Sequence, residues 1–162
     1  MSPIFSPVHG IHTAAGRYLR RVAYEDAPPA RSGEATSAAR HVWQIAFGLA
    51  VRRRFEPDSP LAEIRRTVTA VLQHHAAAAL PALAAEMLIR DALGETVPVD
   101  EIDDAVRSGA HLLLFAGLVE ELAMTDGELE GLVMEAEELA VEVIAEAVRD
   151  QPAASAASLS FT

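Results

Sequence analysis

TSAARHVWQIAFGLAVRRRF, residues 36–55, is the stretch of sequence from which the architecture can be argued. Its apolar side chains fall at nearly every angle around a helix, and a helix of that kind is buried at the centre of a bundle or lies in an interface. Thr36 or Ser37 supplies an N-cap. The three arginines at 52–54 lie in the last turn, where positive charge complements the helix dipole. The stretch therefore predicts a central helix in an all-α protein.

The next two helices are marked by their ends. Asp58-Ser59-Pro60 combines a capping side chain with a proline suited to the first helical turn. Pro81 ends or kinks the helix that follows, because proline removes one backbone hydrogen bond and clashes with the preceding turn. A third helix reaches Leu93, and Gly94 suits the left-handed conformation that commonly follows a helix end.

Two more helices complete the expected bundle. Asp100 is the predicted cap of the fourth, in which the run from Ala110 to Val119 has few polar side chains. Thr125 and Glu128 match a capping box, whose two side chains satisfy unpaired backbone donors at a helix start. We therefore predict an all-α, compact bundle of about five helices over residues 35–150.

The two ends of the chain differ from this bundle in composition. Residues 1–34 contain several prolines and no long helical period, which predicts a flexible or extended N-terminal arm with at most a short helix around residues 13–23. The arm is basic, through Arg17, Arg20 and Arg21. Residues 151–162 are rich in alanine and serine and predict a mobile tail.

Charge is unevenly distributed along the chain. The net charge is −11, and all 13 basic residues are arginine, a composition typical of a GC-rich bacterial genome. Residues 1–55 carry eight arginines and three acidic residues, whereas the remainder carries five arginines and 21 acidic residues. A solvated acidic surface with a basic leader is the simpler interpretation. The asymmetry also fits contact with a surface of opposite charge, such as that of a second copy.

Several classes of function find no support in the sequence. Cysteine is absent, which excludes disulfides and thiolate metal ligands. The N-terminus lacks the features of a signal peptide, and no apolar run approaches the roughly 20 residues of a membrane helix, so we expect a cytoplasmic protein. Nucleophile elbows, phosphate-binding glycine loops and metalloprotease motifs are missing. An acidic body repels the phosphate backbone, which argues against nucleic-acid binding.

Histidine pairs offer no convincing metal site. His9 and His12 form one pair and His74 and His75 another, but a site needs three or four ligands. Adjacent histidines on a helix point about 100° apart, so the second pair cannot easily share one ion. We therefore expect neither a metal nor another cofactor.

The acidic residues of the last helix follow a regular spacing. Glu138, Glu142 and Glu146 line one face at i, i+4 intervals, where like charges repel weakly. A solvated face is the favoured interpretation, and a basic partner is the other. No polar side chain interrupts the apolar stripe opposite them, so no inward-facing acid is expected.

The leading functional hypothesis is a non-enzymatic helical interaction protein, such as an adaptor, accessory subunit or regulator. We expect it to self-associate as a homodimer or larger assembly and to bind another protein, because two helices are apolar nearly all round while catalytic motifs are missing. Two glycines of the fourth helix lie on roughly one face and would let another backbone approach. The residues expected at the interface are Trp43, Phe47, Leu114, Gly109 and Gly117.

The alternative is a helical small-molecule-binding or enzymatic domain. Apolar pockets between helices are common ligand sites. The residues expected to line such a pocket are Trp43, Phe47, Met87, His111 and Phe115.

Overall fold

A computed structural model describes residues 10–24, 36–75 and 79–150. Over these ranges the chain is helical and contains no strand, which confirms the all-α prediction. The elements are α1 (Ala14–Ala23), α2 (Ser37–Arg54), α3 (Leu61–His74), α4 (Ala82–Ala92), the short 3₁₀ helix η2 (Val99–Glu101), α5 (Asp104–Glu121) and α6 (Asp126–Asp150). The remaining parts of the predicted arm, and the predicted tail, lie outside the described residues.

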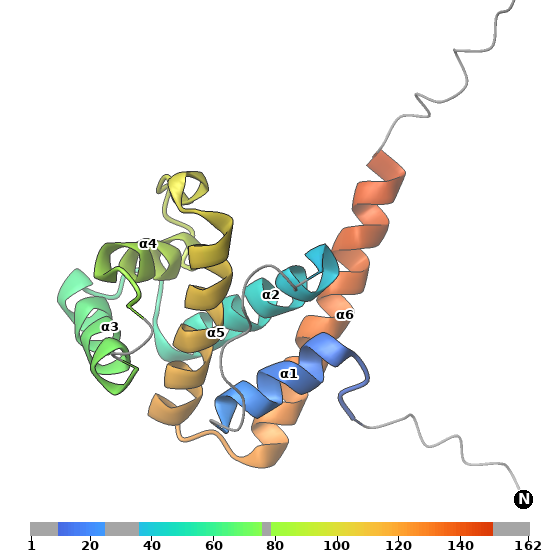
Figure 1. Cartoon of the computed structure of the whole chain (residues 1–162), viewed down its shortest axis with the longest axis horizontal. Coiled ribbons are helices and arrows are strands. Elements are labelled where there is room, and N and C mark those ends of the chain that lie inside the picture. Colours follow the sequence, from blue (N-terminus) through green and yellow to red (C-terminus); the bar gives the residue numbers. More distant parts are fainter. Residues whose placement is uncertain (1–9, 25–35, 76–78, 151–162) are drawn as a thin grey trace, which may run out of the picture.

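Helix α2 runs through the middle of the molecule, with α1, α4, α5 and α6 packed against it (Figure 1). Its buried side chains point to several of these neighbours and include Val42, Trp43, Phe47 and Val51. The hydroxyl of Thr36 accepts a 3.1 Å hydrogen bond from the amide of Ala39, so this predicted cap is confirmed. The apolar side chains around α2 are therefore buried in the core of its own chain.

The other predicted helix ends are confirmed only in part. At the start of α3 Pro60 is the N-cap residue and no side chain makes a cap hydrogen bond, so the capping side chain predicted from Asp58-Ser59 is wrong. The backbone of Gly94 has a φ of +93°, the left-handed conformation expected after α4. The hydroxyl of Thr125 accepts a 3.2 Å hydrogen bond from the amide of Glu128, as one half of the predicted capping box requires. The predicted cap at Asp100 is wrong, because Asp100 lies in η2 and the carboxylate of Asp103 accepts from the amide of Ala105 instead.

The predicted arm contains a helix that belongs to the core. Over its described part, residues 10–24, the chain is not extended: α1 packs against α2, α5 and α6. Leu19 is fully buried and Val22 nearly so, and the indole of Trp43 donates a 3.2 Å hydrogen bond to the carbonyl of Ala15. The short helix foreseen around residues 13–23 is therefore the correct element, and the bundle has six α-helices in the described ranges. The arginines of the predicted basic arm, Arg17, Arg20 and Arg21, are exposed on the outer side of α1.

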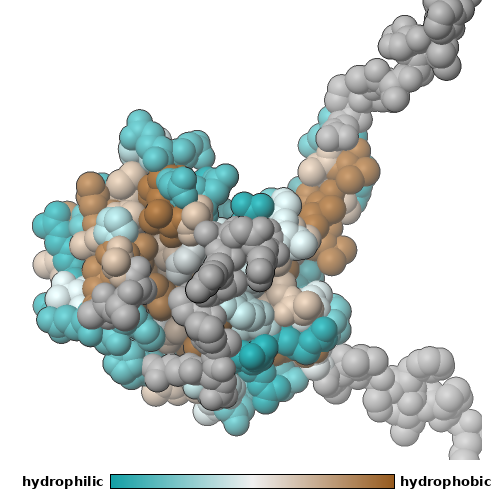
Figure 2. Space-filling model, in the orientation of Figure 1, coloured by the Kyte–Doolittle hydropathy of each residue, from teal (hydrophilic) through white to brown (hydrophobic). Residues whose placement is uncertain are grey.

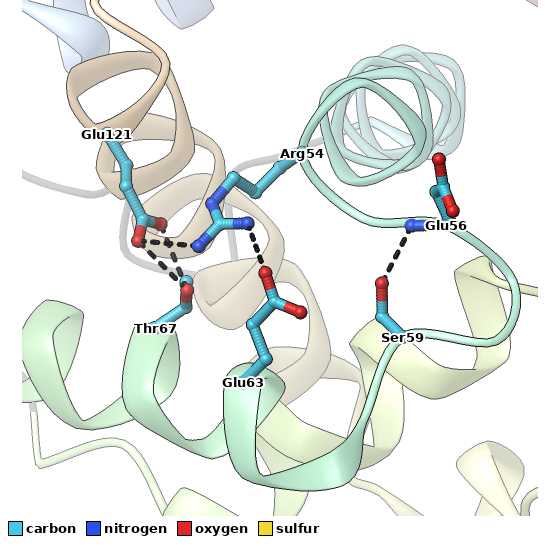
Figure 3. A network of polar contacts seen from close by, with 6 residues as sticks. All are labelled: Arg54, Glu56, Ser59, Glu63, Thr67 and Glu121. Carbon is cyan, nitrogen blue, oxygen red and sulfur yellow. Dashed lines mark hydrogen bonds and ion pairs between the residues drawn. The ribbon is translucent and has the colours of Figure 1, made fainter.

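A polar network joins the ends of α2, α3 and α5 (Figure 3). The guanidinium of Arg54 lies between two carboxylates, 3.0 Å from Glu63 and 3.3 Å from Glu121. The hydroxyl of Thr67 donates to the same Glu121 carboxylate at 3.0 Å. Because Arg54, Glu63 and Glu121 come from three different helices, this network fixes how the three helices meet. No helix in the described ranges is both long and apolar enough to span a membrane.

Candidate functional site

Two adjoining cavities lie along α2. One is where the N-terminal turns of α2 and α5 come together, and the other is further along α2, beside the end of α4 and Val143 of α6. The first, of about 340 Å³, is lined mainly by polar side chains, among them Arg40, His41, Arg107 and His111. The second, of about 300 Å³, is more apolar and includes Ile45, Phe47 and Val143. His41, Gln44 and His111 line both cavities.

His111 lies at the junction of the two cavities. The residue is 6% exposed, and its ring packs against that of Phe47 with centroids 4.9 Å apart. Its imidazole forms no hydrogen bond with any described residue, and its ring nitrogens, unlike the Nε of Arg40, are not fully buried polar atoms without a partner. Burial, and secondarily the positive charge of Arg107, lowers the pKa of His111 to about 4. The ring is therefore neutral at pH 7, with one donor and one acceptor nitrogen.

Arg40 is the second polar group without a partner. Its Nε is buried and has no hydrogen-bond acceptor, and no described carboxylate forms an ion pair with its guanidinium. Arg107 differs, because it pairs with Asp104 one turn earlier and lies 3.6 Å from Asp100. An unpaired buried donor costs roughly 1–3 kcal/mol, so Arg40 is a position where an acceptor from outside the described residues would be stabilising.

The lining of the first cavity carries a net positive charge. It contains two arginines, Arg40 and Arg107, against one acid, Asp104, and its histidines include the neutral His111. The cavity also adjoins the starts of two helices, where the dipole favours negative charge. A positive cavity in a chain of net charge −11 is a local exception. The arrangement can bind an anion, whereas no nucleophile paired with a base is found at this site.

The structure brings together only two of the residues predicted for an apolar pocket. Phe47 and His111 line the second cavity, as described above. Trp43 and Phe115 are core residues with 4% and no exposure, and none of the three described cavities includes Met87.

The residues predicted for an interface are mostly used within the chain. Trp43, Phe47 and Leu114 are buried in the core, so they cannot form an exposed contact surface between copies. A Cβ at Gly117 would overlap the side chain of Val71, so this glycine permits the close approach of α3 and α5. No such neighbour lies within 4 Å of Gly109.

A sequence signal for the polar cavity exists, although it was missed. Its lining residues fall at i, i+3, i+4 and i+7 on both helices, which is the spacing of one helix face. They are Ser37, Arg40, His41 and Gln44 on α2 and Asp104, Arg107, Ser108 and His111 on α5. Two polar stripes at the starts of otherwise apolar helices indicate that the helices face each other across a polar space.

The expectation of no inward-facing acid in the last helix is wrong. Glu137 is 1% exposed and points toward α1, where it accepts hydrogen bonds from the backbone of residues 12 and 13. Glu138, Glu142 and Glu146 are exposed, as predicted for a solvated face.

The C-terminal part of α6 extends away from the helical body (Figure 1). Ala140 is its last buried residue. Beyond it, Val141 is 64%, Ile144 43% and Val148 68% exposed, and Figure 2 shows the hydrophobic surface that covers one side of this extension. We call Val141, Ile144 and Val148 the α6 end face.

A third cavity, of about 340 Å³, contains His74 and His75 beside Glu120 and Glu121. In residues 10–24, 36–75 and 79–150, no group of three or more histidine, aspartate or glutamate side chains is arranged to hold a metal ion. His9, one of the paired histidines in the sequence, lies outside these ranges. Comparison of the chain with protein-family models, curated proteins and solved structures gave no match.

Proposed function

We propose that this protein is a non-enzymatic helical interaction protein that self-associates through the α6 end face. The observation that carries the proposal is the apolar side of α6, which continues beyond the point where its own chain can cover it. Val141 and Val148 are about two thirds exposed. Contiguous exposed apolar side chains usually mark an interaction surface.

The spacing of the α6 end face suits a second copy of the same helix. Val141, Ile144 and Val148 follow i, i+3 and i+7 intervals, the pattern of a helix–helix seam. In an antiparallel pair related by a two-fold axis, Val141 meets Val148 of the other copy and Ile144 meets its own equivalent. Two-fold pairing of this kind is the commonest closed assembly.

Charge does not oppose this pairing. Glu142, Glu146 and Arg149 lie on the side of α6 away from the end face, because their positions are rotated by roughly 100–200° from it. Two end faces can therefore meet without placing like charges opposite each other. Alanines at 145 and 147 flank the face and allow close approach.

The same geometry limits the strength of the association. Stable interfaces bury about 800 Å² on each partner, and three aliphatic side chains on one helix end supply less than that. We therefore propose a dimer that dissociates in the micromolar range, with room for a second protein at the same surface. A weak self-association that leaves the same surface open to a second protein is the interaction function that we assign to the chain.

Sedimentation velocity over about 1–200 µM tests the proposal. We expect the average mass to rise above the 17.3 kDa of one chain as concentration increases. The double variant Val141→Asp/Val148→Asp places charge on the seam and should remain monomeric. Leu83→Asp is the matched control, because Leu83 is 66% exposed on α4, away from the end face, and its change should leave the association intact.

Two results would contradict the proposal. One is a wild-type protein that stays at the monomer mass over the whole concentration range. The other is a double variant that associates as strongly as wild type, which would place the contact elsewhere on the chain. Circular dichroism of each variant checks that the helical fold is retained.

Small-molecule binding is a second candidate function. It is favoured by one observation, the ring of His111 that packs on Phe47 at the junction of two cavities and has no described hydrogen-bond partner. Of the residues predicted for an apolar pocket, Trp43 and Phe115 are in the core and line none of the three described cavities.

A further inference from the structure

We infer that the two adjoining cavities along α2 form one binding site for a small organic monoanion, a carboxylate that carries an apolar body. This inference rests on the second candidate function, small-molecule binding, and names its ligand class. It does not depend on self-association through α6.

The polar end of the site is defined by the unpaired Nε of Arg40 and the ring of His111. Arg40 has a buried Nε without an acceptor and forms no ion pair with a described acid. His111 is more than nine-tenths buried and makes no hydrogen bond with a described residue, yet it lines the cavity. Because most buried polar atoms have partners, the unpaired Nε of Arg40 points to an absent acceptor in this cavity, and the His111 ring offers a second polar group beside it.

The charge of the lining selects a singly charged ligand. Arg40 and Arg107 contribute two positive charges and Asp104 one negative charge, while His111 is neutral. Because Arg107 is already paired with Asp104 and lies 3.6 Å from Asp100, Arg40 is the arginine of the lining left for a ligand, and one carboxylate balances its charge. The planar guanidinium of an arginine also matches a carboxylate with two parallel hydrogen bonds.

The second cavity supplies the apolar end. Ile45, Phe47 and Val143 line it, and its two charged residues, Arg52 and Asp91, balance each other. His41, Gln44 and His111 are shared with the first cavity, so a ligand held at Arg40 can extend along the His111 ring toward Phe47. Volumes of about 340 and 300 Å³ suit a small molecule.

Titration of ¹⁵N-labelled full-length protein at pH 7 tests the inference, with resonances of the arginine Nε–H groups followed by NMR. The probes are hexanoate, hexan-1-ol of the same chain length, and inorganic phosphate. We expect hexanoate to shift the Arg40 Nε–H and the His111 ring in a saturable manner. We expect hexan-1-ol and phosphate to bind at least tenfold more weakly, because each lacks one half of the proposed ligand.

A pair of arginine variants assigns the effect to the site. Arg40→Gln should weaken hexanoate binding about tenfold or more, the loss of one charge-assisted interaction. Arg66→Gln removes an exposed arginine of α3 that lines none of the described cavities, and should leave binding unchanged. Should Arg40→Gln fail to fold, the shifts mapped on the wild-type protein still decide the question.

The possible results distinguish an error in the ligand class from an error in the proposal of small-molecule binding. Equal binding of hexanoate and hexan-1-ol near Phe47 would overturn the anion assignment and leave small-molecule binding standing. Tighter binding of phosphate would overturn the requirement for a monoanion with an apolar body. Linear shifts spread over all arginines, or no shift with any probe, would overturn both the ligand class and the second candidate function.

Discussion

The backbone amide of Thr13 donates a 2.6 Å hydrogen bond to Oε2 of Glu137, a residue 124 positions further along the chain. The amide of His12 donates to Oε1 of the same carboxylate at 3.3 Å. Helix starts leave backbone donors unpaired, and Glu137 satisfies two donors just before α1 from a neighbouring helix. Gly16 leaves room for the carboxylate, because a Cβ there would lie 2.9 Å from Oε2. One buried acid on α6 thus holds the start of α1.

Removal of this carboxylate should release α1 from the body. We expect Glu137→Ala to lower the free energy of unfolding by about 1.5–3 kcal/mol, because it leaves two partly buried donors without a charged acceptor. Trypsin should then cleave at Arg17, Arg20 and Arg21 faster than in wild type. Urea unfolding and timed digestion measure the two effects.

Glu138→Ala is the matched control for this prediction. Glu138 is the next residue on α6, is exposed and has no hydrogen bond with a described residue. We expect its removal to change the unfolding free energy by less than about 0.5 kcal/mol. Equal effects of the two substitutions would show that the contact between Glu137 and Thr13 does not hold α1.

Gly109 and Gly117 of α5 should respond in opposite directions to alanine. A Cβ at Gly117 overlaps Val71 of α3, so Gly117→Ala should destabilise the protein by about 1–3 kcal/mol through overpacking. Nothing outside its own helix backbone lies within 4 Å of a Cβ at Gly109, and Gly109→Ala should stabilise by about 0.5–1 kcal/mol. Thermal unfolding measures both.

A double variant tests the cause of the Gly117 effect. Val71→Ala removes the methyl groups that a Cβ at 117 would strike. Val71→Ala/Gly117→Ala should therefore lose less stability than the sum of the single variants. Additive losses would mean that the two residues do not share one contact.

Much of the fold was accessible from the sequence, because local signals coincide with the helix ends. Thr36, Gly94 and Thr125 lie at the helix ends where the sequence pattern predicted them. Helix α1 was only foreseen as a short segment in an extended arm, because few of its side chains are large and apolar and its start is held by Glu137. No local rule connects residue 13 with residue 137.

The candidate site was less accessible for a related reason. Phe47 and His111 were singled out as apolar pocket residues, but the polar stripe that includes Arg40 was not. Whether an arginine has a partner depends on the relative placement of α2 and α5, which spacing within one helix does not give. The α6 end face was likewise not predicted from the sequence. Its valines have the spacing of core residues, and the sequence does not show where the helical body ends.

His111 makes the stability dependent on pH. Its pKa falls from 6.5 to about 4 on folding, so the unfolded chain binds the proton more tightly. The folded state is therefore favoured above about pH 6.5 and loses stability as pH falls toward 4, by about 3 kcal/mol in all. In His111→Gln the stability should fall less over this range. His75→Gln, at the C-terminal end of α3, is the control, and urea unfolding at a series of pH values measures the difference.

Arg53 and Arg54 are adjacent, yet they should differ in their contribution to stability. Arg54 bridges Glu63 and Glu121 at 3.0 and 3.3 Å and its side chain is 23% exposed, so Arg54→Ala leaves two carboxylates close together and should cost about 1–2 kcal/mol. Arg53 is 43% exposed and 3.9 Å from Glu135, a surface pair worth less than about 0.5 kcal/mol.

Salt dependence then separates charge from packing at Arg54. The side chain also covers the ring of Phe55, with its guanidinium carbon 4.7 Å from the ring centroid. Arg54→Met keeps much of that cover and removes the charge. If ion pairing dominates, Arg54→Met should be nearly as destabilised as Arg54→Ala, and the loss should shrink as ionic strength rises, since salt screens partly exposed charges. A wild-type stability for Arg54→Met would assign the contribution of Arg54 to its contact with Phe55 rather than to the bridge between α3 and α5.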